Sequence, residues 1–475
     1  MNKYQNPLES RYCSDEMLYN FSPEKKFTTW RKLWLALAEI QKELGLDISD
    51  EQIKELKDQV NHIDYAKANE YEKKFRHDVM AHVHAYGDAA PAARPIIHLG
   101  ATSAFVGDNT DLIQIRDGFE LIKIKLVNVI KGLHSFALTY KDHPTLGFTH
   151  FQPAQLTTIG KRATLWLQSV LLDLEDLEFR LQTLRFRGVK GTTGTAASFK
   201  ELFDGDFSKV KELDRKLSEK FGFKKVFKVS GQTYDRKIDA QVLEVLSNIA
   251  QSAHKFTNDL RLLQSLKEIE EPFEKNQIGS SAMAYKRNPM RSERISSLAK
   301  FVISLATSPA MVAATQWFER TLDDSANKRL SIPQAFLATD ALLIIWNNIL
   351  DGLVVYPKMI EKHINEELPF MATEYIIMEG VKNGGDRQEL HEIIRKHSME
   401  AAKTVKIEGK PNDLLDRILT DEKINIDKEK LMRIVNPSNF IGFAPEQTEE
   451  FLDEEVNPIL VKYQHLLGIN SDLKV

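Results

Sequence analysis

The sequence predicts an all-α protein built around a long central helical bundle. Two long stretches lack both glycine and proline, one between Gly160 and Gly188 and one from Gln232 to Glu271. Within both, apolar residues recur at steps of three and four, the spacing of a helix that buries one face. The first repeat consists of Leu167, Val170, Leu174, Leu177, Leu181 and Leu184. The second consists of Ile238, Val242, Val245, Ile249, Ala253, Phe256, Leu260 and Leu263.

Three further stretches have helical patterns, and shorter amphipathic pieces flank them. The long ones run over about Asp111–Tyr140, Arg291–Val312 and Ile332–Leu353. Five helices of this length expose more apolar surface than one small domain covers, so we expect them to pack on their own and on other subunits' copies. The predicted parts are an N-terminal helical domain, a central bundle and a C-terminal helical cap, at residues 1–110, 111–356 and 357–475. No repeat or strand-rich region stands out.

Composition narrows the class of protein. The chain has 475 residues, 28% of them charged, and a formal net charge of −4, which argues against a surface built for nucleic acid. Its single cysteine, Cys13, excludes an intrachain disulfide and fits a reducing compartment. The first residues lack the apolar stretch of a secretory signal, and no run of about eighteen apolar residues predicts a membrane span. These features favour a cytoplasmic, multi-domain globular protein.

The segment from Arg76 to His84 carries the first cluster of polar side chains. His77 stands between Arg76 and Asp78, and the spacing of the histidines, His82 included, gives no clear set of metal ligands. The alternative is a surface helix with solvated histidines.

The segment from His98 to Leu112 is rich in glycine and hydroxyl groups. Thr102 and Ser103 offer hydroxyls and backbone amides that can hold a carboxylate or a phosphate. The alternative is a helix start capped by Asp108 or Asn109, and a loop ahead of a helix can serve both purposes.

Two more loop-like segments surround the first glycine-free stretch. In the segment 147–158, His150 has hydroxyl and amide neighbours that can orient an imidazole, although a lone histidine is more often structural. The segment 188–198, GVKGTTGTAAS, is similar to an anion cradle but lacks the full phosphate-loop pattern.

Basic residues concentrate in two late segments. The segment 278–294 begins Gly-Ser-Ser and contains Lys286, Arg287, Arg291 and Arg294. The segment ERTLDDSANKR contains Arg320, Ser325, Lys328 and Arg329. A solvated basic loop accounts for the charge but not for the mixture with small and hydroxyl residues, so these clusters indicate a small, multiply charged acidic ligand.

At GSSAMAYKRNP the sequence resembles the signature loop of the fumarase/aspartase superfamily, G-S-x-x-M-x-x-K-x-N. The matching residues are Gly279, Ser280, Met283, Lys286 and Asn288. The His77 region, GATS at 100–103 and TH-x-Q-x-AQ at 149–155 also match in the expected order. Within the superfamily, RYCSDEM, RHDVMAH, YKRNPMRSER and ERTLDDSANKR resemble adenylosuccinate lyases of the animal type. Ala284 departs from the usual proline, which should loosen the loop.

The resemblance implies a three-domain, nearly all-helical subunit whose central bundle joins three others in a twenty-helix core. It also implies a homotetramer in which each active site takes residues from three subunits. The implied reaction is β-elimination of fumarate from adenylosuccinate, giving AMP, and from succinyl-aminoimidazole-carboxamide ribotide. No metal, organic cofactor, nucleic acid or membrane partner is implied.

The resemblance also assigns roles to individual residues. Ser280 is the implied base, aided by Lys286, and His150 the implied acid, while His77 binds substrate and helps set the charge of the site. From sequence alone, the neighbouring Ser281 is easily confused with Ser280. The implied substrate-binding residues are Arg11, Tyr12, Arg76, His77, Asp78, Thr102, Ser103, Thr149, Gln152, Gln232, Ser281, Met283, Asn288, Arg294, Arg320, Ser325 and Arg329.

Three other interpretations compete with this one. Another lyase of the superfamily, such as argininosuccinate lyase or fumarase, is disfavoured by the residues around Lys286 and by Arg11 and Arg320. A non-catalytic scaffold of the same fold should have lost reacting groups, yet Ser280 and His150 are present. A nucleic-acid-binding helical protein has only local basic loops in its favour.

Overall fold

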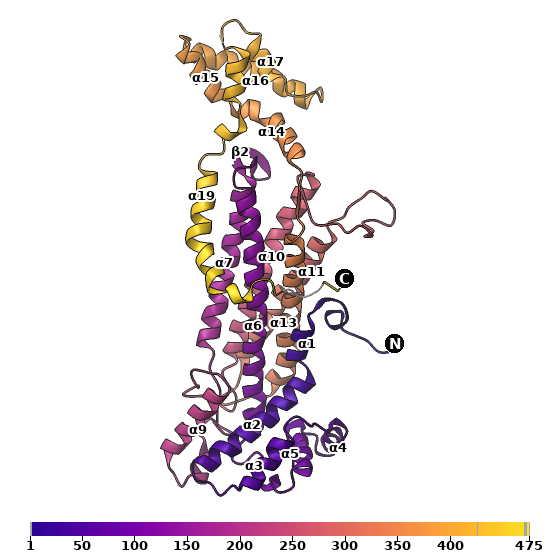
Figure 1. Cartoon of the computed structure of the whole chain (residues 1–475), viewed down its shortest axis with the longest axis vertical. Helices are drawn as coiled ribbons and strands as arrows, with labels where there is room; N and C mark the ends of the chain where they lie inside the picture. The colour runs from indigo at the N-terminus through magenta and orange to yellow at the C-terminus, as the bar shows by residue number, and fades with distance from the viewer. Residues whose placement is uncertain (1, 425, 470–472, 475) are drawn as a thin grey trace.

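The computed structural model describes residues 2–424, 426–469 and 473–474, and it confirms the all-α prediction. The molecule is elongated, with a bundle of long helices at its centre and smaller helical groups at both ends (Figure 1). The long helices are α6 (Ser103–Thr139), α7 (Ile159–Thr183), α10 (Lys237–Ser265), α11 (Met290–Leu305) and α13 (Asp323–Leu350). At one end lie α2 (Pro23–Glu43), α3 (Asp50–Asp58), α4 (Tyr65–Phe75), α5 (Asp78–Ala89) and α9 (Phe207–Lys220). At the other end lie α14 (Pro357–Met371), α15 (Thr373–Lys382), α16 (Arg387–Lys406) and α17 (Leu414–Leu419).

The remaining elements are short. The helices are α1 (Asp15–Asn20), α8 (Ala197–Leu202), α12 (Thr307–Thr315), α18 (Lys428–Ile434), α19 (Ala444–Phe451) and α20 (Asn457–Lys462), with short 3₁₀ and π-helices beside them. The strands are β1 (Pro144–Thr149), β2 (Gln152–Thr158), β3 (Ile269–Glu270) and β4 (Val354–Val355), which form two antiparallel pairs.

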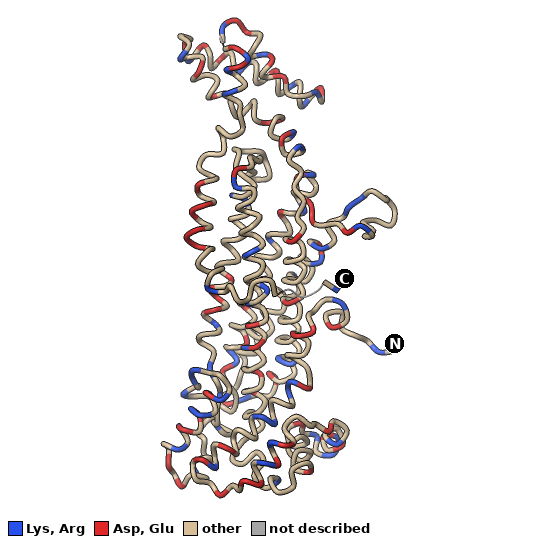
Figure 2. The backbone as a smooth tube through the Cα atoms, viewed as in Figure 1, with Lys and Arg blue, Asp and Glu red and all other residues tan. Residues whose placement is uncertain are grey.

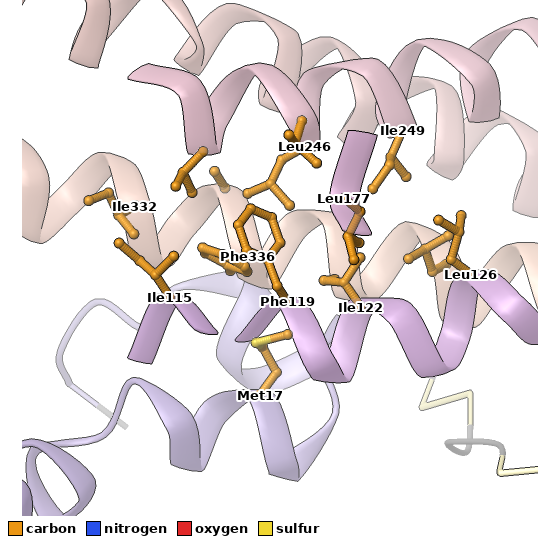
Figure 3. Close-up of a cluster of buried hydrophobic side chains, with 14 of the residues drawn as sticks. Met17, Ile115, Phe119, Ile122, Leu126, Leu177, Leu246, Ile249, Ile332 and Phe336 are labelled. Carbon is orange, nitrogen blue, oxygen red and sulfur yellow. The ribbon is translucent and has the colours of Figure 1, made fainter. Parts of the chain in front are cut away.

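The apolar seams predicted from the sequence form the core of the bundle. Leu177 of α7 and Ile249 of α10 are fully buried and lie beside residues of α6 and α13 such as Ile122 and Phe336 (Figure 3). Burial of a large aliphatic side chain contributes about 1.5–3 kcal/mol, so each seam is a major source of stability.

Helix α6 begins earlier than the sequence pattern suggested. It starts at Ser103 with Thr102 as its N-cap, so Asp108 and Asn109 lie inside the helix and do not cap it. Both side chains are buried. The capping alternative for these two residues is therefore wrong, because each has partners from distant segments instead.

The segment 147–158, expected to be loop-like, is part of a β-hairpin that spans residues 144–158. Leu146 pairs with Leu156 and Thr149 with Gln152 across the two strands. The reversal falls on His150 and Phe151, whose φ angles of 53° and 55° lie in the left-handed region. The hairpin follows α6 and stands at the end of the bundle nearest α14 (Figure 1).

The C-terminal part of the chain has a second, separate core. Its members come from Ala372 to Val435 and include Ile376, Leu390 and Leu431. From Ala444 onward the chain returns to the bundle, where α19 packs on α7.

Two helices are long and apolar enough to cross a membrane by length and composition alone, which differs from the expectation of no such run. For the segment Asp323–Leu350, 78% of the apolar window is buried inside the protein, as in an ordinary core helix. For Met290–Thr315 only 33% is buried.

Candidate active site

Nine of the predicted substrate-binding residues line one cavity of about 500 Å³. The cavity lies where the α4–α5 junction meets the first turn of α6, the chain before α10 and the first turns of α13. These nine residues are Arg76, His77, Asp78, Thr102, Ser103, Gln232, Arg320, Ser325 and Arg329. Segments more than 200 residues apart in the sequence thus supply one pocket, in which basic and hydroxyl groups lie together with the carboxylates of Glu72, Asp78, Asp108 and Asp111.

His77 is held at the cavity wall by two hydrogen bonds. As the N-cap of α5, its Nδ1 accepts a hydrogen bond from the Met80 backbone N–H at 3.3 Å. In the neutral ring the proton therefore sits on Nε2, which lies 3.2 Å from Ser103 Oγ. This arrangement fixes the imidazole with one N–H beside the N-terminus of α6, where anions are favoured.

The histidines of this region differ in how deeply they are buried. The expectation of a helix with solvated histidines fails for His82, which is 5% exposed and stacks on Phe27 with ring centroids 3.9 Å apart. Burial, with a smaller contribution from Arg31, lowers the pKa of His82 to about 4. His82 is a structural group that does not line the cavity.

The guanidinium groups of the cavity are oriented by neighbouring polar groups. Arg329 forms an ion pair with Asp78 at 2.9 Å. Arg320 donates to the side-chain oxygen of Gln232 at 2.9 Å and lies 3.5 Å from Asp324. Their positions are therefore set before any ligand binds, which lowers the entropic cost of binding an anion.

A buried ionic network supports this wall, and no sequence motif predicts it. Asp108 of α6 pairs with Arg236 at 3.0 Å and with Lys328 at 3.2 Å, and Arg236 also pairs with Asp324 at 2.6 Å. Burial alone would raise the pKa of Asp108, but Arg236 and Lys328 outweigh it and hold this pKa well below its usual range. Asp324 and Lys328 lie on the same helix as Ser325 and Arg329. The network therefore fixes the position of these two predicted substrate-binding residues.

Lys26 is a further cavity residue without a local signal in the sequence. It lines the same pocket from α2, and burial lowers its pKa. Its ammonium lies 5.3 Å from the Phe27 ring and 5.1 Å from the Trp30 ring.

The signature loop lies elsewhere, between β3 and α11, and projects from the side of the bundle (Figure 1). The Asn288 side chain donates to the Gly279 carbonyl at 2.8 Å. A Cβ on Gly279 would lie 2.2 Å from the carbonyl oxygen of Lys286, so only glycine permits this closure of the loop.

The two serines of the loop differ in their contacts. Ser280 Oγ accepts hydrogen bonds from the backbone N–H groups of Ala282 at 3.3 Å and Met283 at 3.1 Å. Ser281 is exposed, as are Met283 and Lys286. Two N–H donors directed at one oxygen stabilise negative charge on that oxygen.

Arg11, Tyr12 and Arg294 form a group at the base of the signature loop. The Arg294 guanidinium lies 5.5 Å from the Tyr12 ring, and that of Arg11 lies 5.8 Å from it. Arg294 belongs to α11, the helix that follows the loop, so the N-terminal segment and the loop meet here.

The candidate residues therefore occupy three places in one chain. The cavity of about 500 Å³ holds the first group, the signature loop with the Arg11 segment holds the second, and the β1–β2 hairpin holds Thr149, His150 and Gln152. His150 is exposed at the hairpin turn. The described residues contain no group of three or more His, Cys, Asp or Glu placed to hold a metal ion.

Fold and motifs together define a lyase. A family described as "Lyase" matches residues 15–304. The fold is shared with a fumarate lyase from Mesorhizobium sp. BNC1 (TM-score 0.77, 22% identity, covering 95% of this chain and all of that one). It is also shared with a 3-carboxy-cis,cis-muconate lactonizing enzyme from Pseudomonas putida (TM-score 0.80, 20% identity, covering 97% of this chain and all of that one).

Closer relatives identify the family. The chain is 56% identical to an adenylosuccinate lyase of Saccharomyces cerevisiae, over 98% of this chain and 97% of the relative. It is 49% identical to one of Schistosoma mansoni, over 100% and 99% of the two chains. A family described as "Adenylosuccinate lyase C-terminus" matches residues 369–451. The chain belongs to the adenylosuccinate lyase family.

Proposed function

We propose that this protein is a carbon–nitrogen lyase that releases fumarate from adenylosuccinate, leaving AMP, and from succinyl-aminoimidazole-carboxamide ribotide. The observation that carries the proposal is the single cavity in which Arg76, Arg320 and Arg329 lie around His77 and Ser103. Each substrate carries two carboxylates and a phosphate, which such a cavity suits because guanidinium groups bind these anions with paired hydrogen bonds.

In the proposed reaction, Ser280 removes a proton from the carbon next to one carboxylate. The resulting dianionic aci-carboxylate then expels the nitrogen, and His150 gives that nitrogen a proton as the C–N bond breaks. The two backbone N–H groups that face Ser280 Oγ support its role as the base, since they stabilise the alkoxide. Lys286 contributes positive charge, and closure of the loop excludes water.

The remaining side chains bind and orient substrate. Arg11, Tyr12, Arg320, Ser325 and Arg329 surround the nucleotide and its phosphate. The rest of the site is lined by Arg76, His77, Asp78, Thr102, Ser103, Thr149, Gln152, Gln232, Ser281, Met283, Asn288 and Arg294. The proposed chemistry is acid–base and electrostatic, and the proposed set of groups includes no metal ion or organic cofactor.

Each active site is proposed to combine three subunits of a homotetramer. Helix α6 has 37 residues, which corresponds to a length of about 55 Å. Ser103 stands at its start and the His150 hairpin follows its end, so the two cannot meet within one chain. In the proposed tetramer, an antiparallel neighbouring subunit places its own hairpin, with its own His150, beside the cavity of the first subunit.

Exposed apolar residues on the bundle support the tetramer. Leu165, Leu172 and Phe179 follow one another at seven-residue intervals along α7 and are 52%, 59% and 59% exposed. A seven-residue apolar stripe is the pattern by which helices pack on partner helices. The low burial of Met290–Thr315 has the same explanation, because α11 then lies in the core that the four bundles form. With a single reduced cysteine, the tetramer is proposed to work in the cytoplasm.

The reaction is tested by ultraviolet absorbance of the purified protein mixed with adenylosuccinate, with fumarate and AMP separated by chromatography. We expect turnover in the wild type and in Ser281→Ala, and its loss in Ser280→Ala and His150→Ala with the assembly intact. Loss in Ser281→Ala with activity kept in Ser280→Ala would exchange the two serines. Activity only on argininosuccinate or malate would overturn the assignment of the substrate. No turnover of any of these compounds would favour a non-catalytic scaffold.

The sharing of sites is tested by mixing two inactive variants. Ser280→Ala and Arg320→Ala remove groups that lie in different parts of one chain, so a mixed tetramer contains some sites with both groups present. Refolding the two variants together should restore part of the activity, whereas either variant refolded alone should stay inactive. Failure of a mixed tetramer of proven composition to regain activity would rule out shared sites.

A further inference from the structure

A second cavity, of about 840 Å³, lies on another part of the molecule. It is bounded by the segment 185–196, by α9 and by the segment 224–228. None of its lining residues lines the candidate active site. It is therefore a separate site, and part of its wall is the glycine- and threonine-rich segment 188–198, which the proposed function leaves without a role.

Positive charge predominates in this cavity. Seven basic and three acidic side chains line it, and the three acids already have partners. Asp214 pairs with Lys190, while Glu212 and Glu219 both pair with Arg215. The five other cations have no carboxylate partner within ion-pair distance in the described part of the chain: Arg185, Lys211, Lys224, Lys225 and Lys228. Figure 2 shows several Lys and Arg positions together near α9.

The cavity also has apolar and aromatic walls. Val189 and Val210 line it and are buried, and Phe207 and Phe227 add aromatic rings to its lining. Phe207 is 69% exposed although it lines a cavity, so its ring is available to a ligand. Lys211 lies 5.2 Å from this ring, and Arg185 lies 6.0 Å from the ring of Phe227. Flat apolar surface next to unpaired cations suits a ligand with an aromatic base and several phosphates.

The wall of the cavity is fixed and is joined to the candidate active site. Gly194 has φ +83°, and a Cβ there would lie 1.8 Å from the Ser230 carbonyl oxygen, so the turn requires glycine. Arg187 donates to the carbonyl oxygens of Gly191, at 3.1 Å, and Gln232, at 2.5 Å. Gln232 in turn holds Arg320 in the candidate active site. A ligand in the second cavity thus contacts the segment that positions a substrate-binding residue.

We propose that this cavity is a binding site for a nucleoside triphosphate, distinct from the active site. Its volume is within the range of small-molecule sites. Five cations without a carboxylate partner among the described residues match a triphosphate better than the single phosphate of a nucleoside monophosphate. The aromatic rings account for a base, which inorganic polyphosphate lacks.

The test is to measure the affinity of the full-length protein for ATP by isothermal titration calorimetry. The pocket variant is Lys225→Gln/Lys228→Gln, which keeps side-chain size while removing two of the cations. The matched control is Lys200→Gln/Lys237→Gln, because both lysines are exposed and lie outside the cavity. Fumarate release by each variant serves as the check that the protein is folded, since none of these lysines belongs to the proposed active site.

We expect ATP to bind the wild type and the control with equal affinity, and to bind the pocket variant at least about tenfold more weakly. A hydrogen bond to a charged group contributes about 1.5–3 kcal/mol, and about 1.4 kcal/mol corresponds to a tenfold change in affinity. Fumarate release should be unchanged in both variants. Equal affinity for the pocket variant and the wild type, or no binding to the wild type, would overturn the proposal. Equal affinity for ATP and tripolyphosphate would overturn the assignment to a nucleotide, because the aromatic walls would then contribute nothing.

Discussion

Protonation of His82 should make the fold sensitive to mild acid. The ring is buried between α5 and α2, stacked on Phe27 and edge-on to Trp30 at 5.4 Å. Burial lowers its pKa from 6.5 to about 4. The unfolded chain binds a proton below pH 6.5 while the folded protein does not. The stability contributed by neutral His82 is therefore complete above pH 6.5 and is lost as the pH falls from 6.5 to 4.

The size of this effect follows from the pKa difference. At pH 5 the unfolded His82 is almost fully protonated, whereas the folded ring is still mostly neutral. Between pH 7 and pH 5 the free energy of unfolding should fall by about 2 kcal/mol through this residue alone, at about 1.4 kcal/mol per pKa unit. His82→Phe keeps an aromatic ring against Phe27 but removes the proton-binding group.

The assay is urea-induced unfolding of the wild type and His82→Phe at pH 7 and pH 5. The fall in unfolding free energy between the two pH values should be about 2 kcal/mol smaller in the variant, while all other titrating groups cancel in this comparison. Phe27→Leu is the control, because it disturbs the same contact but retains the imidazole, and it should keep a wild-type pH dependence. An identical pH dependence in the wild type and His82→Phe would refute the assignment of a buried neutral histidine.

Three substitutions test other parts of the structure. Gly279→Ala should lower turnover with assembly unchanged, because its Cβ would lie 2.2 Å from the carbonyl oxygen of Lys286; normal kcat would show that the loop closes differently during catalysis. Lys328→Met should destabilise the protein by about 3 kcal/mol in thermal unfolding, since Asp108 loses one of its buried partners, and an unchanged Tm would mean that Arg236 alone suffices. Leu177→Ala should cost about 3 kcal/mol in the same measurement, because the side chain is fully buried; a loss below about 1 kcal/mol would indicate that the seam collapses around the gap.

The helices of the bundle were predictable because their signal is local. A helix that buries one face repeats its apolar residues every three or four positions, and Val242, Ile249 and Phe256 of α10 are all fully buried as that pattern requires. The motif segments were predictable for a similar reason, since each is contiguous. Thr102 and Ser103 reach the cavity simply because the helix that follows them begins there.

The support of the site was not predictable in this way. Asp108, Arg236 and Asp324 are separated by 128 and 88 residues, and no property of the intervening sequence brings them together. Each looks like an ordinary surface charge when read alone. Charged residues are rarely buried unless they are paired, so the network becomes visible only when the packing of α6 against α13 is known.

Helix α7 shows why the assembly is also only partly encoded in visible patterns. Leu167 and Leu174 face the core of their own subunit and are buried, whereas Leu165 and Leu172 lie two positions earlier in each repeat and are more than half exposed. In the sequence the two sets are equally apolar, so periodicity cannot tell which face meets the same chain. Once the first face is assigned to the bundle, the second is left exposed in the described subunit, and the proposed tetramer would cover it. The helix α6 that separates Ser103 from the His150 hairpin therefore runs beside the surface at which, in the proposed tetramer, a second chain brings the two together.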